Sequence, residues 1–177
     1  MDLTLEAAVK DAQTVLKDAT PLAKIPDGMR IRPAPLHADE RGSITEIFSR
    51  NWDWDHQPLD HLYMFTIRPG VSKGWGLHKK QEDRYFLISG DVQLVMYDVR
   101  PDSSTYGRVM TLVMSEKNRR LITIPAFVWH ADVNLGTTEA QLINMPTVAF
   151  NAEDPDKYRL PLDTPLIPYD FGTMRGW

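Results

Sequence analysis

The chain has 177 residues, of which 42% are hydrophobic and 25% charged, and its formal net charge at pH 7 is −4. This length fits a single domain, because one core of this size can bury roughly two-thirds of the surface that the unfolded chain exposes. The composition excludes a disordered protein, and the lack of a basic excess argues against nucleic acid as a partner. The absence of cysteine excludes disulfide bonds, thiol nucleophiles and zinc sites with cysteine ligands.

The segment from Met1 to Thr20 has neither the basic start nor the apolar centre of a secretory signal. No later stretch approaches the roughly 20 apolar residues of a membrane span, so we expect a cytoplasmic protein with no membrane partner. Six apolar residues of this segment recur at helical spacing: Leu5, Ala8, Val9, Ala12, Val15 and Leu16. They predict a short amphipathic helix that ends before Pro21, within an N-terminal helical extension over residues 1–28.

From Ile31 to Met145 the sequence consists of short runs rich in β-branched and aromatic residues, separated by turn-forming residues. The expected strands are 43–48, 61–68, 74–78, 84–88, 92–97, 108–114, 120–124 and 140–145. No helix of ordinary length interrupts them, so we predict an all-β barrel or sandwich. Both faces of the run 61–68 carry apolar side chains, which suggests a barrel wall that is covered on both sides.

The tail beyond Met145 contains five prolines between residues 146 and 168. Proline disrupts central strands and helices, because it lacks a backbone N–H and fixes its own φ angle. We expect residues 146–177 to wrap the barrel as an extended Pro-rich tail, so that residues 1–177 form one domain.

Two short segments concentrate the residues that could carry chemistry. The first runs from Gly74 to Asp83 and is closed by Gly90, and the second runs from Ile124 to Asn134. His78 and Asp83 are five positions apart on strands joined by a tight turn, so both side chains can point into the barrel. In the second segment Pro125 fixes the start and His130 lies on the following strand.

These segments resemble the two cupin motifs, G-x5-H-x-H-x3-4-E-x6-G and G-x5-P-x-G-x2-H-x3-N. His78 falls on the second histidine of the first motif, Asp83 on its acid and Gly90 on its closing glycine. Gly76 stands where the first histidine would be, and Phe127 replaces the glycine of the second motif. The resemblance implies a cupin-type antiparallel β-barrel, or jelly roll.

A sharper resemblance, to the dTDP-4-dehydrorhamnose 3,5-epimerase family, covers roughly Pro35 to Phe171. It is carried, in the family's order, by Asp39-Glu-Arg-Gly-Ser-Ile-Thr-Glu-Ile-Phe48, Gly76-Leu-His78, Gly90 to Arg100, Ser103 to Gly107, and Ile124 to His130. The chain is most similar to a shorter, divergent branch among polysaccharide-biosynthesis proteins. The resemblance implies a nucleotide-sugar substrate, no cofactor and a homodimer.

The resemblance also implies roles for individual residues. His78 corresponds to the catalytic base, which suits an imidazole whose pKa lies near physiological pH. Asp163 lies, offset by one, where the family has the carboxylate that orients this base. Arg41 and Glu46 correspond to residues that reach the nucleotide across a dimer interface, and His130 to a residue that lines the pocket.

Three positions depart from the family pattern. Trp75 replaces a pocket arginine and Asp83 a pocket lysine, and both are expected to contact substrate. Phe150 falls near the position of the proton-donating tyrosine. The lost positive charge could be replaced by Lys73, Lys79, Lys80 or Arg84. The lost proton donor could be replaced by Tyr158 or Tyr85.

Three functions therefore stay open at the level of sequence. The first is an epimerase or isomerase that acts beside the keto group of a dTDP-4-keto-6-deoxyhexose-like sugar, with His78 as the base. The second is a metal-dependent cupin enzyme, in which His78, Asp83 and His130 hold a divalent transition metal. The third is a non-catalytic protein that binds a sugar nucleotide.

Overall fold

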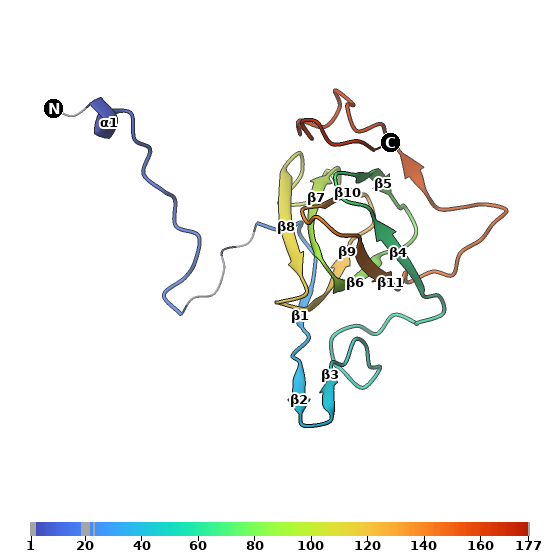
Figure 1. Cartoon of the computed structure of the whole chain (residues 1–177). Helices are drawn as coiled ribbons and strands as arrows, with labels where there is room; N and C mark the ends of the chain where they lie inside the picture. The colour runs from blue at the N-terminus through green and yellow to red at the C-terminus, as the bar shows by residue number, and fades with distance from the viewer. Residues whose placement is uncertain (1–2, 19–21, 23, 177) are drawn as a thin grey trace.

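A computed structural model of the chain describes residues 3–18, 22 and 24–176. Two five-stranded sheets form the barrel (Figure 1). In spatial order, the first sheet contains β1 (Ile31–Pro33), β9 (Arg120–Ile124), β6 (Asp83–Ser89), β11 (Ala140–Asn144) and β4 (Tyr63–Ile67). The second contains β12 (Tyr158–Arg159), β5 (Ser72–Leu77), β10 (Val128–Asn134), β7 (Asp91–Asp98) and β8 (Val109–Ser115). All neighbouring strands are antiparallel, which confirms the predicted all-β class.

Most of the predicted strands lie close to the observed ones, but the run 43–48 is a strand only as far as Ile44 and belongs to a hairpin outside the two large sheets. The run 120–124 matches β9 at both ends, and the boundaries of β5 to β8 differ from their predicted ranges by one or two residues. The chain crosses from one sheet to the other between β5 and β6, through the short turn that follows His78. Gly90 turns the chain between β6 and β7 with φ at +93°, and a Cβ there would lie 3.0 Å from the Cβ of Ala140. Both facts explain why glycine closes the first motif.

The core lies between the two sheets. Its inward side chains include Leu87, Leu94, Met96, Ile122 and Leu142, all of them buried. The tail covers the outer face of the second sheet, where Ile167, Tyr169 and Phe171 pack with Trp75, Val95, Ala131 and Val133. The central strands of this sheet are therefore largely buried on both faces.

The N-terminal segment differs from the expectation of an amphipathic helix. Helix α1 spans only Leu3–Glu6, and in Figure 1 this helix and the segment that follows it lie apart from the barrel. Val9 is 91% exposed, and Val15 and Leu16 are also exposed. The predicted helix end at Pro21 lies outside the described residues. A helix this short is marginal in water unless its apolar face is buried.

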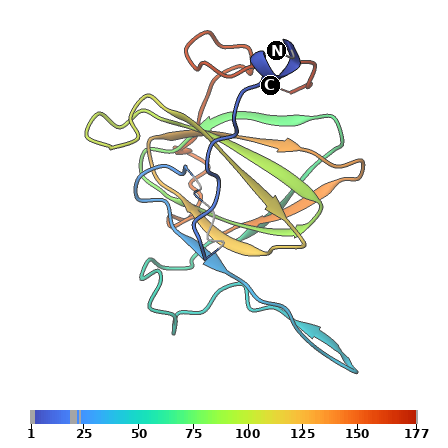
Figure 2. The same cartoon turned by 90° about the vertical axis from the view of Figure 1, so that its left-hand side faces the viewer.

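Two further elements lie at the edge of the molecule. Strands β2 (His37–Asp39) and β3 (Gly42–Ile44) form a separate hairpin that projects from the barrel (Figure 2). On the edge strand β4, Met64 is 60% exposed, and the neighbouring Leu62 is also exposed. The expectation that both faces of the run 61–68 are covered is therefore wrong for this face. None of the helices in the described residues is long and apolar enough to cross a bilayer.

Candidate functional site

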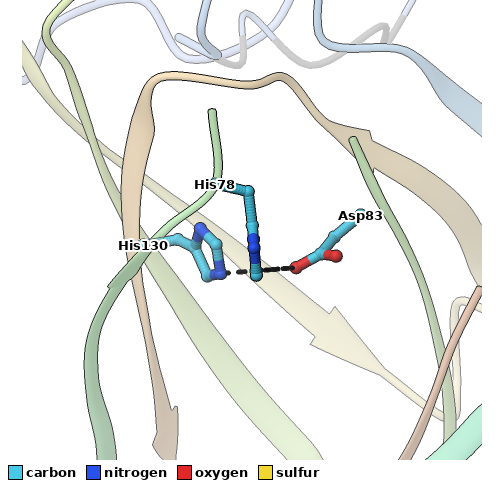
Figure 3. Close-up of side chains that lie close together, drawn as sticks. All are labelled: His78, Asp83 and His130. Carbon is cyan, nitrogen blue, oxygen red and sulfur yellow. Dashed lines mark ion pairs between the residues drawn. The ribbon is translucent and has the colours of Figure 1, made fainter. Parts of the chain in front are cut away.

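His78, Asp83 and His130 point toward one another at one end of the barrel (Figure 3). His78 follows β5, Asp83 begins β6, and His130 lies on β10 opposite Gly76 of β5. Oδ2 of Asp83 lies 3.3 Å from Nε2 of His78 and 3.5 Å from Nε2 of His130. All three side chains are buried, and together they form a compact polar cluster between the two sheets.

Backbone carbonyls fix the orientation of both imidazole rings. Nδ1 of His78 contacts the carbonyl oxygen of Asp156, and Nδ1 of His130 lies 3.2 Å from the carbonyl oxygen of Val128. A carbonyl oxygen only accepts hydrogen bonds, so each Nδ1 carries a hydrogen. The Nε2 atoms of the two neutral rings are therefore lone-pair acceptors, and both face the carboxylate of Asp83.

The electrostatics of the cluster favour one proton on His78. Burial lowers the pKa of His78, but the close contact with the Asp83 carboxylate and the negative charge of that group outweigh burial and raise the pKa overall. Burial raises the pKa of Asp83, yet the interaction with His78 holds it far below its ordinary value. Burial lowers the pKa of His130 to about 4. At neutral pH Asp83 is thus ionised and His130 is neutral, and His78 has the highest affinity for a proton.

Asp156 holds His78 in place from the tail. Its carboxylate accepts hydrogen bonds from three successive backbone N–H groups, those of Lys79 at 3.0 Å, Lys80 at 2.7 Å and Gln81 at 3.2 Å. Its carbonyl meets His78, and β12 then pairs with the end of β5. We call residues 154–159 the strap. The strap ties the tail to the turn that follows His78.

Two adjoining cavities lie beside the cluster. The tail cavity has a volume of about 420 Å³. It is lined by His61, Tyr63, His78, Lys80, Gln81, Pro146, Val148, Ala149, Phe150, Asn151 and residues 154–157. The barrel cavity, of about 100 Å³, is lined by Tyr63, Phe65, Lys73, Gly74, Gly76, Tyr85, His130, Asp132, Lys157 and Arg159. Tyr63 and Lys157 line both cavities, so the two spaces meet at these residues.

Asp132 brings a second buried carboxyl group to the barrel cavity. Its Oδ1 atom is buried and has no hydrogen-bond partner among the described residues. Burial raises its pKa to about 7, and Asp83 adds to that effect, while the cations of Lys157 and Lys73 oppose it. Near neutral pH this group can therefore exchange a proton, and the sequence motifs give no sign of it.

The structure does not bring all the predicted residues to this site. Trp75 packs edge-on against Tyr169 and Phe171 and lines neither cavity. Asp163 is exposed on the tail, and the contacts of the His78 ring nitrogens go to Asp156 and Asp83 instead. Nothing in the sequence marks Asp156, because the group it offers to His78 is a backbone carbonyl.

Arg41 and Glu46 lie away from His78 within the same chain. Arg41 stands at the tip of the projecting hairpin, where its exposed side chain pairs with Asp39 (Figure 1). Glu46 is exposed beyond the end of β3. Neither residue lines the two cavities within this one copy of the chain.

The candidate cations named from the sequence are mostly engaged elsewhere. Lys80 pairs with Asp154 at 3.0 Å, Lys79 lies over the ring of Tyr158, and Arg84 pairs with the buried Asp55 at 2.9 Å. Lys73 lines the barrel cavity and lies 5.4 Å from the ring centre of Phe65. Lys157, which sequence reasoning missed, lines both cavities.

A tyrosine hydroxyl is also present at the junction of the cavities. Asn144 Nδ2 donates a hydrogen bond of 2.9 Å to the hydroxyl of Tyr63, which leaves the hydroxyl hydrogen free to be donated. Tyr85 lines the barrel cavity, whereas Tyr158 lines neither cavity. Phe150 lines the tail cavity and stacks on His61. The alternation of strand 61–68 was the available signal for Tyr63, since it places this residue on the face opposite Leu62 and Met64.

The cluster also has the donor set of a metal site. The ligand atoms of His78, Asp83 and His130 all lie within 4.8 Å of one another. Two histidines and one carboxylate can hold a divalent transition metal, and such histidines usually donate their other N–H to a carbonyl group. The cupin motif has a further histidine at the position of Gly76, and in this chain the Lys157 side chain lies beside that position. A Cβ on Gly76 would lie 3.7 Å from Cε of Lys157. A lysine cation at this place repels a second cation, so the residues present fit a proton better than a metal ion.

Comparisons with known proteins agree with this fold. The chain is 37% identical over 145 residues to the probable low-salt glycan biosynthesis epimerase Agl13 of Haloferax volcanii, covering 81% of this chain and 92% of the relative. It is 33% identical over 150 residues to the spore coat polysaccharide biosynthesis protein SpsL of Bacillus subtilis, covering 83% and 97%. The crystal structure of a dTDP sugar isomerase from Desulfovibrio desulfuricans superimposes with a TM-score of 0.76, at 24% identity, over 84% of this chain and 94% of that one.

The family predicted from the sequence is confirmed by a family model that matches most of the chain. Residues 23–161, which include every strand of the barrel, match the family described as dTDP-4-dehydrorhamnose 3,5-epimerase. The solved structure confirms the cupin-type barrel, and enzymes of this family act without a cofactor. The chain therefore belongs to the dTDP-4-dehydrorhamnose 3,5-epimerase family.

Proposed function

We propose that His78 is the base with which this sugar-nucleotide epimerase removes a proton beside the keto group of a dTDP-4-keto-6-deoxyhexose. The observation that carries this role is the contact between Nδ1 of His78 and the carbonyl of Asp156. It fixes the tautomer in which Nε2 of the neutral ring holds the lone pair. His78 also lines the tail cavity, the larger of the two spaces beside the cluster.

The reaction needs only proton transfers. Nε2 of His78 takes the proton, the C–H electron pair forms the C=C bond of an enolate, and the carbonyl π electrons move to the oxygen. When a proton returns to the same carbon from the opposite face, the ketone is restored and the carbon is inverted. The Asp83 carboxylate, 3.3 Å from Nε2, stabilises the imidazolium that forms after the first step.

Nε2 is covered in the substrate-free chain, where it makes no hydrogen bond to a described residue. Catalytic hydrogen bonds are often poorly aligned before substrate binds and tighten only in the complex. We therefore expect the contact of Nε2 with Asp83 to lengthen when the sugar binds, while the carboxylate stays close enough for its charge to act on the ring.

Tyr63 is our choice for the group that returns the proton. It lines both cavities, and its hydroxyl accepts a hydrogen bond from Asn144 and so keeps its own hydrogen for donation. Burial raises its pKa, which keeps the hydroxyl protonated at neutral pH. Tyr63 thus supplies the proton donor that Phe150 cannot be.

We further propose that the active protein is a homodimer. Arg41 and Glu46 lie on or just after a hairpin that projects away from the barrel, so within one chain they do not reach His78 (Figure 2). In a dimer they would reach the nucleotide bound by the partner. The exposed apolar side chains of Leu62 and Met64 on an edge strand offer a surface that a second copy can cover.

Proton exchange tests the base. The wild-type protein is incubated in deuterated buffer with a dTDP-4-keto-6-deoxyhexose, and the loss of ring proton signals is followed by NMR. We expect exchange in the wild type, a loss of at least about 100-fold in His78→Ala, and no change in the exposed control His56→Ala. Absence of exchange in the wild type, or undiminished exchange in His78→Ala, would contradict the proposal.

Subunit mixing tests the dimer. Arg41→Ala and His78→Ala are each expected to be nearly inactive alone. If nucleotide contacts cross the interface, mixing the two variants restores one complete site in each heterodimer. Random 1:1 mixing makes about half of the dimers heterodimers, so up to about a quarter of the wild-type activity should return. A monomer in light scattering, or no recovery on mixing, would contradict this arrangement.

A further inference from the structure

Lys157 reaches from the strap into the space beside the His78–Asp83–His130 cluster. Its Cε and Nζ atoms lie 3.7 and 4.0 Å from the position that a Cβ on Gly76 would take. Nε2 of His130 lies 3.6 Å from the same position. The lysine side chain and the His130 ring therefore flank one point of the barrel cavity, over a residue that has no side chain of its own.

The backbone on both sides of Lys157 is fixed. Asp156, the residue before it, is tied to three backbone N–H groups of the turn after His78. Tyr158, the residue after it, pairs with Leu77 of β5. The position of the lysine relative to His78 is thus set by hydrogen bonds and does not depend on a free loop. Lys157 is exposed, and its side chain lines both cavities of the site.

The charges around Lys157 leave its ammonium group available. Burial lowers its pKa, and the negative charges of Asp83 and Asp132 act in the opposite direction. Across the described ranges, Lys157 makes no ion pair with a carboxylate, unlike Lys80 with Asp154 or Arg84 with Asp55. Its hydrogen-bond donors can therefore serve a bound ligand.

We propose that Lys157 is a catalytic residue whose ammonium group binds the keto oxygen of the sugar and stabilises the enolate. This inference rests on the function proposed above. Removal of the proton by His78 places negative charge on the keto oxygen, and a positioned cation in a partly desolvated site stabilises this charge more in the transition state than in the ground state. The tail thus contributes a reacting group as well as a cover for the barrel.

The test measures steady-state kinetics and proton exchange with a dTDP-4-keto-6-deoxyhexose. Lys157→Gln is compared with the wild type and with Lys117→Gln, a matched control in the exposed turn between β8 and β9. For Lys157→Gln we expect kcat to fall about 100-fold to 1,000-fold, as on loss of one oxyanion donor, with KM changed less than about threefold. Lys117→Gln is expected to keep kcat within about threefold of the wild type, because Lys117 is exposed and lines neither cavity of the site.

A rescue experiment separates chemistry from structure. In Lys157→Ala, added methylammonium or ethylammonium is expected to raise the rate at least about tenfold in a saturable way, because the freed space can hold the small cation. A purely structural role would give no such rescue. Thermal unfolding of each variant is recorded alongside.

The outcomes separate the two proposals. If the wild type exchanges ring protons but Lys157→Gln keeps its kcat, the role of Lys157 is overturned and the role of His78 stands. If Lys157→Gln loses activity and Lys157→Ala is not rescued by amines, the catalytic role is also overturned. If the wild type itself exchanges no protons, both proposals fail.

Discussion

Asp132 is expected to make the stability of the protein depend on pH. The residue is 4% exposed, and its Oδ1 atom has no hydrogen-bond partner among the described residues. Burial raises its pKa from 3.8 to about 7, with a further contribution from Asp83, while Lys157 and Lys73 oppose the change. We therefore consider the substitution Asp132→Asn, which removes the charge and keeps the shape.

The sign follows from the protons bound by each state. Between about pH 4 and pH 7 the folded protein keeps the Asp132 proton while the unfolded chain has lost it, so folding becomes less favourable as pH rises. Each pKa unit corresponds to about 1.4 kcal/mol, so the full effect above pH 7 is on the order of 4 kcal/mol. The amide side chain in Asp132→Asn does not ionise, so the variant lacks this loss.

Urea unfolding at pH 4.5 and pH 8 measures the effect. We expect Asp132→Asn to be no more stable than the wild type at pH 4.5 and more stable by about 2–4 kcal/mol at pH 8. The control Asp102→Asn, at an exposed turn, is expected to follow the wild type at both values. Parallel pH profiles for the wild type and Asp132→Asn would refute the buried, proton-binding carboxyl group.

Three further predictions concern the cluster and the strap. Asp83→Asn should lower kcat and move the acidic limb of the pH–rate profile to lower pH, because the carboxylate raises the pKa of His78; an unmoved limb would argue against this coupling. Asp156→Ala should lower the free energy of unfolding by about 1–3 kcal/mol, since three backbone N–H groups lose their acceptor, whereas Asp154→Ala, which removes a surface ion pair, should cost less than about 1 kcal/mol. Treatment with a chelator followed by dialysis should leave the exchange rate unchanged, and a loss restored only by a divalent metal would favour the metal-dependent alternative.

Local patterns account for the strands that were predicted well. In β8, Met110, Leu112 and Met114 are buried while Thr111 and Val113 are exposed, and this alternation is visible in the sequence. The N-terminal segment shows the limit of such patterns, because helical spacing of apolar residues produces a stable helix only where another surface covers them.

The site residues also fall into those that local sequence patterns predict and those that depend on distant contacts. His78, Asp83 and His130 could be predicted because a short turn and the pairing of β5 with β10 fix their relative positions. Lys157 and Asp156 could not, because they arrive through a long tail with no regular pattern. Asp156 contacts His78 through its backbone carbonyl, and the side chain of Lys157 lies in the space that Gly76 leaves open.

The tail explains why the departures from the family pattern occur together. Asp83 stands where the family resemblance implies a lysine, and it raises the pKa of His78, whereas the charge of Lys157 lowers that pKa. We infer that the strap supplies the cation that the family resemblance places on a strand, and that the charges of Asp83 and Lys157 together set the proton affinity of the base. Trp75, at the position of a pocket arginine, packs instead on Tyr169 and Phe171 and so fastens the tail to the outer face of the barrel. A tail that supplies a reacting group needs such an anchor, so Trp75→Ala should reduce kcat through Lys157, and the amine that rescues Lys157→Ala should not rescue it.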